Sequence, residues 1–136
     1  MGTANTVCVI DKNKNYIGGM IYPGIGVSLD SLTANASQLG GISLEAPEHI
    51  IGKNTVECMK SGTIYSAAAA IDGIIDRLAE ELDGDVTVVA TGGLAGKIVP
   101  HCRRKVRLDE DLLLKGLAVI YQKNRPFTQL KFPRKD

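Results

Sequence analysis

The sequence contains no tryptophan, and aromatic residues make up only 4% of its 136 residues. Aromatic platforms on which single-stranded nucleic acid stacks are therefore not expected. Sixteen basic residues stand against fifteen acidic ones, so the net charge is only +1. A protein this close to neutrality has no broad electrostatic field that would hold nucleic acid or an anionic membrane, and we expect neither as a partner.

Long hydrophobic runs are also missing. No apolar stretch approaches the ~20 residues that span a bilayer, and no charged-then-apolar leader opens the chain, so secretion is not expected. The three cysteines, Cys8, Cys58 and Cys102, are an odd number and lie far apart. Their spacing excludes a CxxC redox pair and a sequence-local zinc site, and favours free thiols in a reducing cytoplasm.

The composition that remains is that of a globular domain. Hydrophobic residues make up 44% of the chain and charged residues 23%, close to the average for folded domains. A chain of 136 residues has room for one ordinary domain or for one lobe of a larger protein.

Hydrophobic periodicity predicts two strands, two helices, and then strand, helix, strand and helix. The two strands, Thr6–Asp11 and Tyr16–Tyr22, are separated by a polar turn and should form a hairpin. Gly18 and Gly19 inside the second strand indicate a bulge or a close backbone approach. A first helix is expected over Ile25–Ala36, with its inward face formed by Ile25, Leu29, Leu32 and Ala36.

The longest predicted helix runs from Thr55, a favourable N-cap residue, to Leu82. Small residues near its start let another helix approach closely; they include Gly62, Ser66, Ala69 and Ala70. Val86–Ala90 has the fully apolar pattern of a buried strand, and Lys105–Leu108 is a weak one. Asp109 is expected to cap a last helix through Tyr121, and residues 125–136 form a polar tail that we expect to be mobile.

Three short motifs could carry chemistry. Gly2–Thr6 offers backbone N–H groups and hydroxyls to an anion, although an ordinary polar N-terminus would look the same. Thr91–Gly93 follows a buried strand, at the end of the strand where α/β sheets bind ligands, but it could be only a tight turn. Thr55 begins a helix whose N-terminus could hold a carboxylate, or it could serve only as the N-cap.

Other candidate motifs are weaker. Gly92–Lys97 ends in Gly-Lys, but Ile98 stands where a Walker A loop needs Ser or Thr. His49 and His101 have no second metal ligand at a suitable spacing, so surface or packing roles are expected. No pair of acidic residues stands out as a general acid and base.

Taken together, the motifs resemble the type III pantothenate kinases in order and spacing over roughly residues 2–124. The resemblance rests on Gly2–Thr6, Tyr16–Gly19 with Pro23–Gly24, Gly52–Glu57, Ser61–Gly62, Thr91–Ala95 and Leu114–Leu117. It implies an α/β fold of the acetate and sugar kinase/Hsp70/actin (ASKHA) superfamily, built from two ribonuclease H-like lobes. Residues 1–124 resemble the C-terminal lobe alone, with a mixed sheet and flanking helices.

The resemblance also implies an activity: ATP-dependent phosphorylation of pantothenate to 4'-phosphopantothenate, the first step of coenzyme A biosynthesis. Gly2 and Thr3 would contact ATP, Gly92 and Gly93 would lie near the nucleotide, and Thr55 would contact pantothenate. Members of the family are homodimers that use Mg²⁺ and a monovalent cation, K⁺ or NH₄⁺. A homodimer through the 55–82 helix is therefore expected.

The chain departs from the family pattern in three respects. The first-lobe phosphate loop and the aspartate that serves as the base have no counterpart here, and the cation-binding aspartate would fall just before Met1. Phosphoryl transfer depends on positioning and on charge neutralisation around the phosphates, so the chain is expected to be inactive without an N-terminal lobe, supplied separately or lost. The alternative hypothesis is a non-catalytic dimerisation or regulatory module derived from the kinase.

Overall fold

The computed structural model describes residues 1–34 and 42–124. The predicted tail at 125–136 and the end of the predicted first helix lie outside these residues. The elements are β1 (Ala4–Ile10), β2 (Tyr16–Pro23), α1 (Ile25–Ala34), α2 (Thr55–Glu81), β3 (Val88–Ala90), α3 (Ala95–Ile98), the 3₁₀ helix η1 (Val99–His101), β4 (Val106–Leu108) and α4 (Leu112–Asn124). The predicted order is confirmed, with η1 added.

β1 and β2 form the predicted antiparallel hairpin. Its register shifts between Val9 and Ile10, and a Cβ added to Gly19 would lie only 1.8 Å from the carbonyl oxygen of Val7. Both features that the paired glycines predicted, a bulge and a close backbone approach, are therefore present. In the turn, the Asp11 carboxylate accepts hydrogen bonds from the Asn13 and Asn15 N–H groups, each at 2.8 Å, and the bonds from Asn15 lower the pKa of Asp11.

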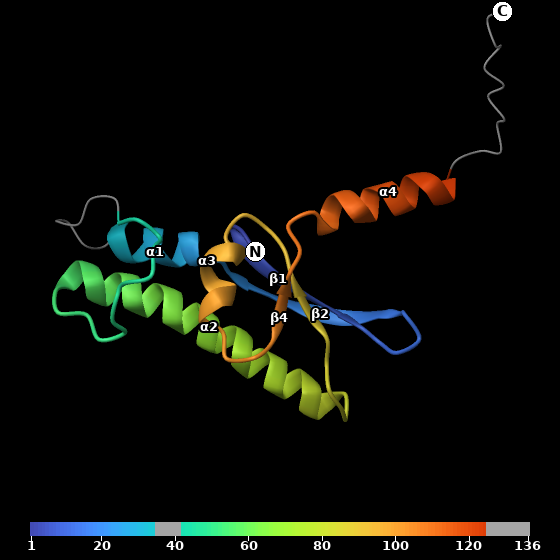
Figure 1. Cartoon of the computed structure of the whole chain (residues 1–136), viewed down its shortest axis with the longest axis horizontal. Helices are drawn as coiled ribbons and strands as arrows, with labels where there is room; N and C mark the ends of the chain where they lie inside the picture. Colours follow the sequence, from blue (N-terminus) through green and yellow to red (C-terminus); the bar gives the residue numbers. More distant parts are fainter. Residues whose placement is uncertain (35–41, 125–136) are drawn as a thin grey trace, which may run out of the picture.

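The strands form two separate two-stranded sheets, where one mixed sheet was expected (Figure 1). β1 pairs with β2 in antiparallel fashion, while β3 pairs with β4 in parallel fashion. The prediction of a buried strand over Val86–Ala90 is wrong: the strand covers only Val88–Ala90, and Val89 keeps 43% of its surface exposed. β3 borders an open cleft, which Val106 of β4 also lines, so its apolar side chains are only partly covered.

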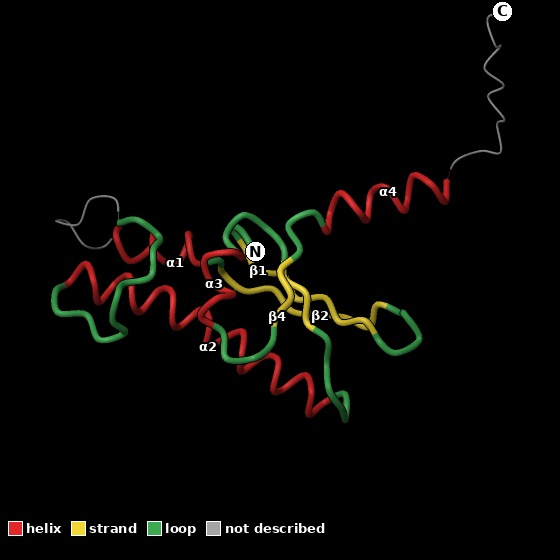
Figure 2. Tube along the Cα trace, in the orientation of Figure 1, coloured by secondary structure: helices red, strands yellow, loops and turns green. Residues whose placement is uncertain are grey.

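The core lies where α2 packs against α1 and the short helices α3 and η1 (Figure 2). Its fully or nearly fully buried side chains are Ile25, Ile64, Ala68 and Ile98. The inward face predicted for α1 is only partly right: Ile25 and Leu29 are buried, whereas Leu32 is 54% exposed. Leu32 borders an open groove between α1 and α2, so no element among residues 1–34 and 42–124 fully covers it.

α4 extends away from the rest of the molecule (Figure 1), and its apolar side chains are exposed, Leu113 by 71%. The Asp109 carboxylate accepts hydrogen bonds from the Asp111 N–H at 3.2 Å and from Lys115 Nζ at 2.7 Å. The last helix begins at Leu112, three positions after Asp109, and continues to Asn124, past the predicted end at Tyr121. That Asp109 caps this helix stays a prediction. Within residues 1–34 and 42–124, no helix is long and apolar enough to cross a membrane.

Candidate functional site

The start of β1 meets two turns that are distant in the sequence. The Met1 amino nitrogen donates a hydrogen bond to the Thr91 carbonyl oxygen at 2.7 Å, and the Leu94 N–H donates to the Met1 carbonyl at 3.5 Å. On the other side, the Gly24 N–H donates to the Thr3 carbonyl at 2.9 Å. Residues 1–3 are thus held between the turn that precedes α1, at Gly24, and the turn that follows β3, at residues 91–94. We call this meeting point the junction. The structure brings together two of the motifs that the sequence singled out.

Glycine is required on both sides of this junction. Gly92 has φ +105°, and a Cβ on it would lie 2.4 Å from the Met1 carbonyl oxygen. A Cβ on Gly24 would lie 1.8 Å from the Gly2 carbonyl oxygen. A side chain at either position would therefore push the first residues away from the turn, because the space is already filled. At Gly92 the backbone would be strained as well, since L-residues rarely adopt such a φ.

Thr3 presents its side chain to solvent at this junction. Its carbonyl is engaged by Gly24, whereas its hydroxyl makes no hydrogen bond within the described part of the chain. α1 begins at Ile25, directly after Gly24, and carries no acidic residue in its first turn. A free hydroxyl beside the positive end of a helix is a favourable environment for an anionic group.

A groove of about 640 Å³ begins two residues further along β1. Asn5 of β1 and Tyr22 of β2 line it on one side, and Thr55 and Thr63 of α2 line it on the other. Asn5 is only 4% exposed. Burial raises the pKa of Tyr22, and the hydrogen bond with Asn5 opposes that shift without cancelling it. The groove therefore connects β1, which Thr3 precedes, with the helix that Thr55 begins.

The prediction that Thr55 is the N-cap of the long helix is wrong. Asn54 is the N-cap: its Oδ1 accepts a hydrogen bond from the Glu57 N–H at 2.9 Å, and Glu57 Oε2 accepts one from the Lys53 N–H at 2.8 Å. Asn54 Nδ2 also donates to Glu57 Oε1 at 2.9 Å, so the arrangement is a variant of the capping box in which the glutamate accepts from the N–H of the residue before the cap. Thr55 is exposed, and its hydroxyl has no hydrogen-bond partner among residues 1–34 and 42–124, which leaves it available to a ligand.

Thr63 is a groove residue that sequence reasoning missed. It lies eight positions after Thr55 on α2, close to the same helix face, and it is 7% exposed. Its Oγ1 has no hydrogen-bond partner within the described residues. Helical spacing from Thr55 could have indicated its place, but that spacing does not reveal that Thr63 is buried in the folded chain.

Ionisable groups are scarce here. The described residues that line the groove include no Asp, Glu or His, and residues 1–34 and 42–124 contain no group of three side chains that could hold a metal ion. We therefore assign no metal ligand to this chain. His101 packs edge-on against the Tyr65 ring, with centroids 5.3 Å apart, and His49 is exposed. Both histidines have the packing or surface roles that were predicted.

Comparison of the sequence with known proteins identifies the family to which the chain is related. The sequence model of the type III pantothenate kinases matches residues 1–77. A type III pantothenate kinase from Exiguobacterium sp. is 45% identical over 124 residues, which are 91% of this chain and 48% of that relative. The corresponding protein from Moorella thermoacetica is 45% identical over 123 residues, 90% of this chain and 48% of the relative. The chain thus spans about half the length of these relatives.

A solved structure supports the fold. It is described as a conserved Baf family transcriptional activator from Campylobacter jejuni, and it matches 90% of this chain and 54% of its own chain with a TM-score of 0.54. At 20% identity, this likeness establishes a shared fold and nothing about activity. The family itself follows from the sequence match over residues 1–77: the chain belongs to the type III pantothenate kinases.

Proposed function

We propose that this chain is the C-terminal lobe of a type III pantothenate kinase of the ASKHA superfamily, acting in the cytoplasm. The complete enzyme would transfer the γ-phosphoryl group of ATP to the hydroxyl of pantothenate, giving 4'-phosphopantothenate and ADP in the first step of coenzyme A biosynthesis. The observation that carries the proposal is the junction at Gly2 and Thr3, which adjoins the Thr91–Gly93 turn and leads along β1 into the groove beside Thr55.

ATP would bind at the junction. Gly2 and Thr3 would lie against the phosphates, with the Thr3 hydroxyl as a hydrogen-bond donor. Gly93 supports this arrangement, because a Cβ built on it meets nothing within 4 Å, so the turn has open space beside it. The positive N-terminus of α1 would favour the negative phosphates.

Pantothenate would bind in the groove at the start of α2. This molecule carries a carboxylate, an amide and hydroxyl groups. The free Thr55 hydroxyl can hydrogen-bond with one of them, and the N-terminus of a 27-residue helix favours a carboxylate. The buried, unpartnered Thr63 hydroxyl provides a second polar contact.

The chemical step would need groups beyond these. Phosphoryl transfer uses a base or positioning residue for the nucleophile and cations that neutralise the phosphates, and no acidic residue is among the described residues that line the groove. In this proposal Mg²⁺ and the monovalent cation, K⁺ or NH₄⁺, act in the complete enzyme, and the chain alone is inactive. The N-terminal lobe would supply the missing parts.

We also propose a homodimer through the 55–82 helix. Gly62, Ser66, Ala69 and Ala70 are exposed on α2, and three of them, Gly62, Ser66 and Ala70, also line the groove. Because small residues allow close helix approach, a second copy could cover this face and part of the groove. The second candidate function is a non-catalytic dimerisation or regulatory module. Two observations favour it: the exposed small residues of α2 suit an interface, and no acidic residue is among the described residues that line the groove.

A paired substitution at the junction tests the kinase proposal. The chain would be combined with the part of the Exiguobacterium sp. relative that it does not match. The KM for ATP would then be measured for Thr3→Val and for Thr6→Val, which changes an exposed threonine of β1 three positions away. Loss of one hydroxyl contact is worth about 0.5–1.5 kcal/mol, so Thr3→Val should raise the KM for ATP up to about tenfold, and Thr6→Val should leave it unchanged. Equal values for both variants would contradict the ATP assignment.

A further inference from the structure

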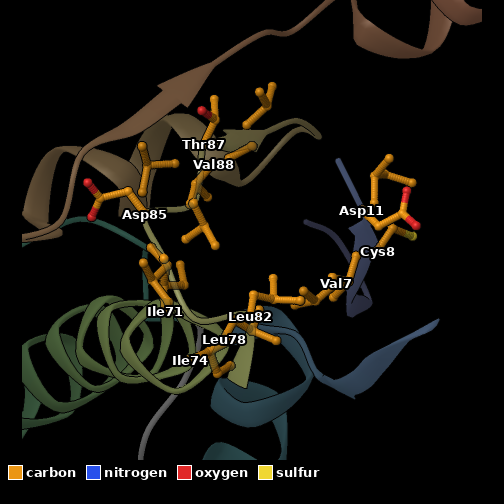
Figure 3. Close-up of a pocket in the computed structure, with 18 of the residues that line it drawn as sticks. Val7, Cys8, Asp11, Ile71, Ile74, Leu78, Leu82, Asp85, Thr87 and Val88 are labelled. Carbon is orange, nitrogen blue, oxygen red and sulfur yellow. The ribbon is translucent and has the colours of Figure 1, made fainter. Parts of the chain in front are cut away.

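Two hollows in the described part of the chain differ in chemistry. One is a cleft of about 660 Å³ between β1 and β3, and aliphatic side chains of α2, among them Ile71, Ile74 and Leu78, form its floor (Figure 3). The other is the groove beside Thr55, of about 640 Å³, whose lining includes several buried polar side chains. A ligand that needs hydrogen bonds is therefore better matched by the groove.

Thr63 places a buried hydroxyl in this groove without a partner. The residue is 7% exposed, and among the residues that the structure describes its Oγ1 is the one buried side-chain polar atom with no hydrogen bond. Two other hydroxyls of the groove are occupied, since Ser28 Oγ donates to the Gly24 carbonyl at 3.1 Å and Ser66 Oγ donates to the Thr63 carbonyl at 3.4 Å. An unpaired buried hydroxyl lowers stability, so Thr63 marks a place where a ligand group can bind.

Two polar side chains of the β1–β2 hairpin line the same groove. Asn5 and Tyr22 are partners in the register of the hairpin, and their side chains share a hydrogen bond. Asn5 is only 4% exposed. Burial raises the pKa of Tyr22, so its phenol keeps its proton near neutral pH. The amide, the phenol and the Thr63 hydroxyl can each donate and accept a hydrogen bond, and none of them is charged.

The groove offers no charge to a ligand. Its described lining contains no Asp, Glu, His, Lys or Arg. Most of the other lining side chains are apolar: Pro23, Ile25, Leu32, Met59, Ala67 and Ala70. A carboxylate placed among them would lose its water without gaining a cation, which costs far more than burying a hydroxyl or an amide that finds hydrogen bonds. Uncharged groups that both donate and accept therefore fit this part of the groove.

We propose that Asn5, Tyr22 and Thr63 form a subsite that binds the uncharged, hydroxyl-bearing end of the ligand in the groove and excludes a carboxylate. The inference rests on the proposed binding of pantothenate and adds the direction in which that molecule lies. Thr63 follows Thr55 by about 12 Å along the helix axis, so a ligand whose carboxylate lies at the N-terminus of α2 extends its hydroxyl end toward Thr63. Asn5 lies two positions after Thr3, which places this end toward the junction.

Three small molecules test the subsite with the purified full chain. The first is pantothenate; the second is pantothenol, in which an alcohol replaces the carboxylate; the third is pantoate, in which the hydroxyl-bearing half ends in a carboxylate of its own. NMR follows the methyl group of Thr63 and the side-chain amide of Asn5. We expect pantothenate and pantothenol to shift both signals, and pantoate at the same concentration to leave both unchanged.

The other outcomes separate this proposal from the proposed function. Shifts with pantoate as large as those with pantothenol would overturn the exclusion of a carboxylate. No shift of Thr63 or Asn5 with pantothenol would overturn the subsite, and the proposed pantothenate site would survive if pantothenate still shifted the backbone amide of Thr55. If no signal from the groove responded to any of the three molecules, the subsite and the pantothenate site would both be wrong.

Thr63→Val separates ligand binding from a role in the fold. Valine has nearly the same shape, and the hydroxyl that it removes has no partner in the folded chain, so the melting temperature should not fall. The Kd for pantothenol should rise up to about tenfold. Thr63→Ser keeps the hydroxyl and should retain most of the affinity. Thr6→Val, at an exposed position outside the groove, should change neither quantity. A lower melting temperature for Thr63→Val with an unchanged Kd would overturn the proposal.

Discussion

The amino nitrogen of Met1 lies 2.7 Å from the carbonyl oxygen of Thr91, ninety positions away in the sequence. This contact joins the two glycine-containing motifs that local pattern had identified separately. It also places the start of β1 beside the end of β3. The proposed ATP-binding junction depends on this contact.

The first prediction concerns the glycine that permits this contact. Gly92→Ala should lower the free energy of unfolding by about 1–3 kcal/mol, because alanine is strained at a positive φ and its Cβ would lie 2.4 Å from the Met1 carbonyl oxygen. Urea denaturation measures the change. In the complete enzyme, the same variant should also raise the KM for ATP.

Gly93→Ala is the matched control. A Cβ at this neighbouring position meets nothing within 4 Å, and its φ is not positive. The free energy of unfolding should therefore change by no more than about 0.5 kcal/mol. Similar losses for the two variants would show that the Met1 contact does not set the stability of this turn.

The second prediction separates capping from binding at the start of α2. Asn54→Ala should destabilise the protein by about 1 kcal/mol, because it removes the side chain that accepts from the Glu57 N–H. Thr55→Val should leave stability almost unchanged and, in the complete enzyme, raise the KM for pantothenate up to about tenfold. Thermal unfolding and initial-rate kinetics provide the two readouts. A lower melting temperature for Thr55→Val with an unchanged KM would contradict the binding role.

Much of the fold followed from local sequence signals. The β1–β2 hairpin, its glycine-dependent bulge and the element order depend on turn residues and hydrophobic periods that act over a few positions. The split into two sheets could not be predicted, because strand partners are set by contacts distant in the sequence. The exposure of Leu32 and Val89 was missed for the same reason, since periodicity indicates an apolar face but not whether another element covers it.

The site was predictable only in parts. The motifs at Gly2–Thr3 and Thr91–Gly93 were identified, but nothing local indicated that Met1 joins them. At the start of α2, two adjacent residues, Asn54 and Thr55, both favour the N-cap position, and the spacing to Glu57 that decides between them was overlooked. The roles of Gly2, Thr3 and Thr55 in binding ligands stay predictions.

The third prediction concerns oligomeric state. If two copies associate through the exposed small residues of α2, Ala69→Glu should promote dissociation, because it places a bulky charge on that face. Sedimentation equilibrium at micromolar concentration should give twice the 14.5 kDa of the single chain for the unsubstituted protein. Glu80→Lys, an exposed position on the same helix, should leave the dimer intact. A single species of 14.5 kDa before any substitution would end the dimer proposal.

The fourth prediction follows from the environment of Cys102. Burial, and to a lesser extent the charge of Asp72, raises the pKa of Cys102 to about 11, whereas Cys8 and Cys58 are exposed. At about pH 9 only ~1% of the Cys102 thiol is ionised, and the thiolate is the reactive form. Iodoacetamide should therefore label Cys8 and Cys58 first, and Cys102 labelling should accelerate about tenfold per pH unit up to pH ~11. If Cys102 in the folded protein is labelled as fast as Cys8 and Cys58 at pH ~9, the account is contradicted. As the control, all three cysteines should be labelled at similar rates in urea, where the fold no longer covers Cys102.

The most direct test of the central claim is a coupled ADP-release assay with ATP, Mg²⁺, a potassium salt and pantothenate. The purified chain alone should give no pantothenate-dependent ADP release, because general-base assistance alone is worth about 10²–10⁴-fold and no acidic residue is among the described residues that line its groove. Co-expression with the part of the Exiguobacterium sp. relative that this chain does not match should restore release. Turnover by the chain alone in the ordinary enzyme range of about 1–10³ s⁻¹ would contradict the claim that it is one lobe of a two-lobed kinase, and so would a correctly folded pair of lobes with no activity.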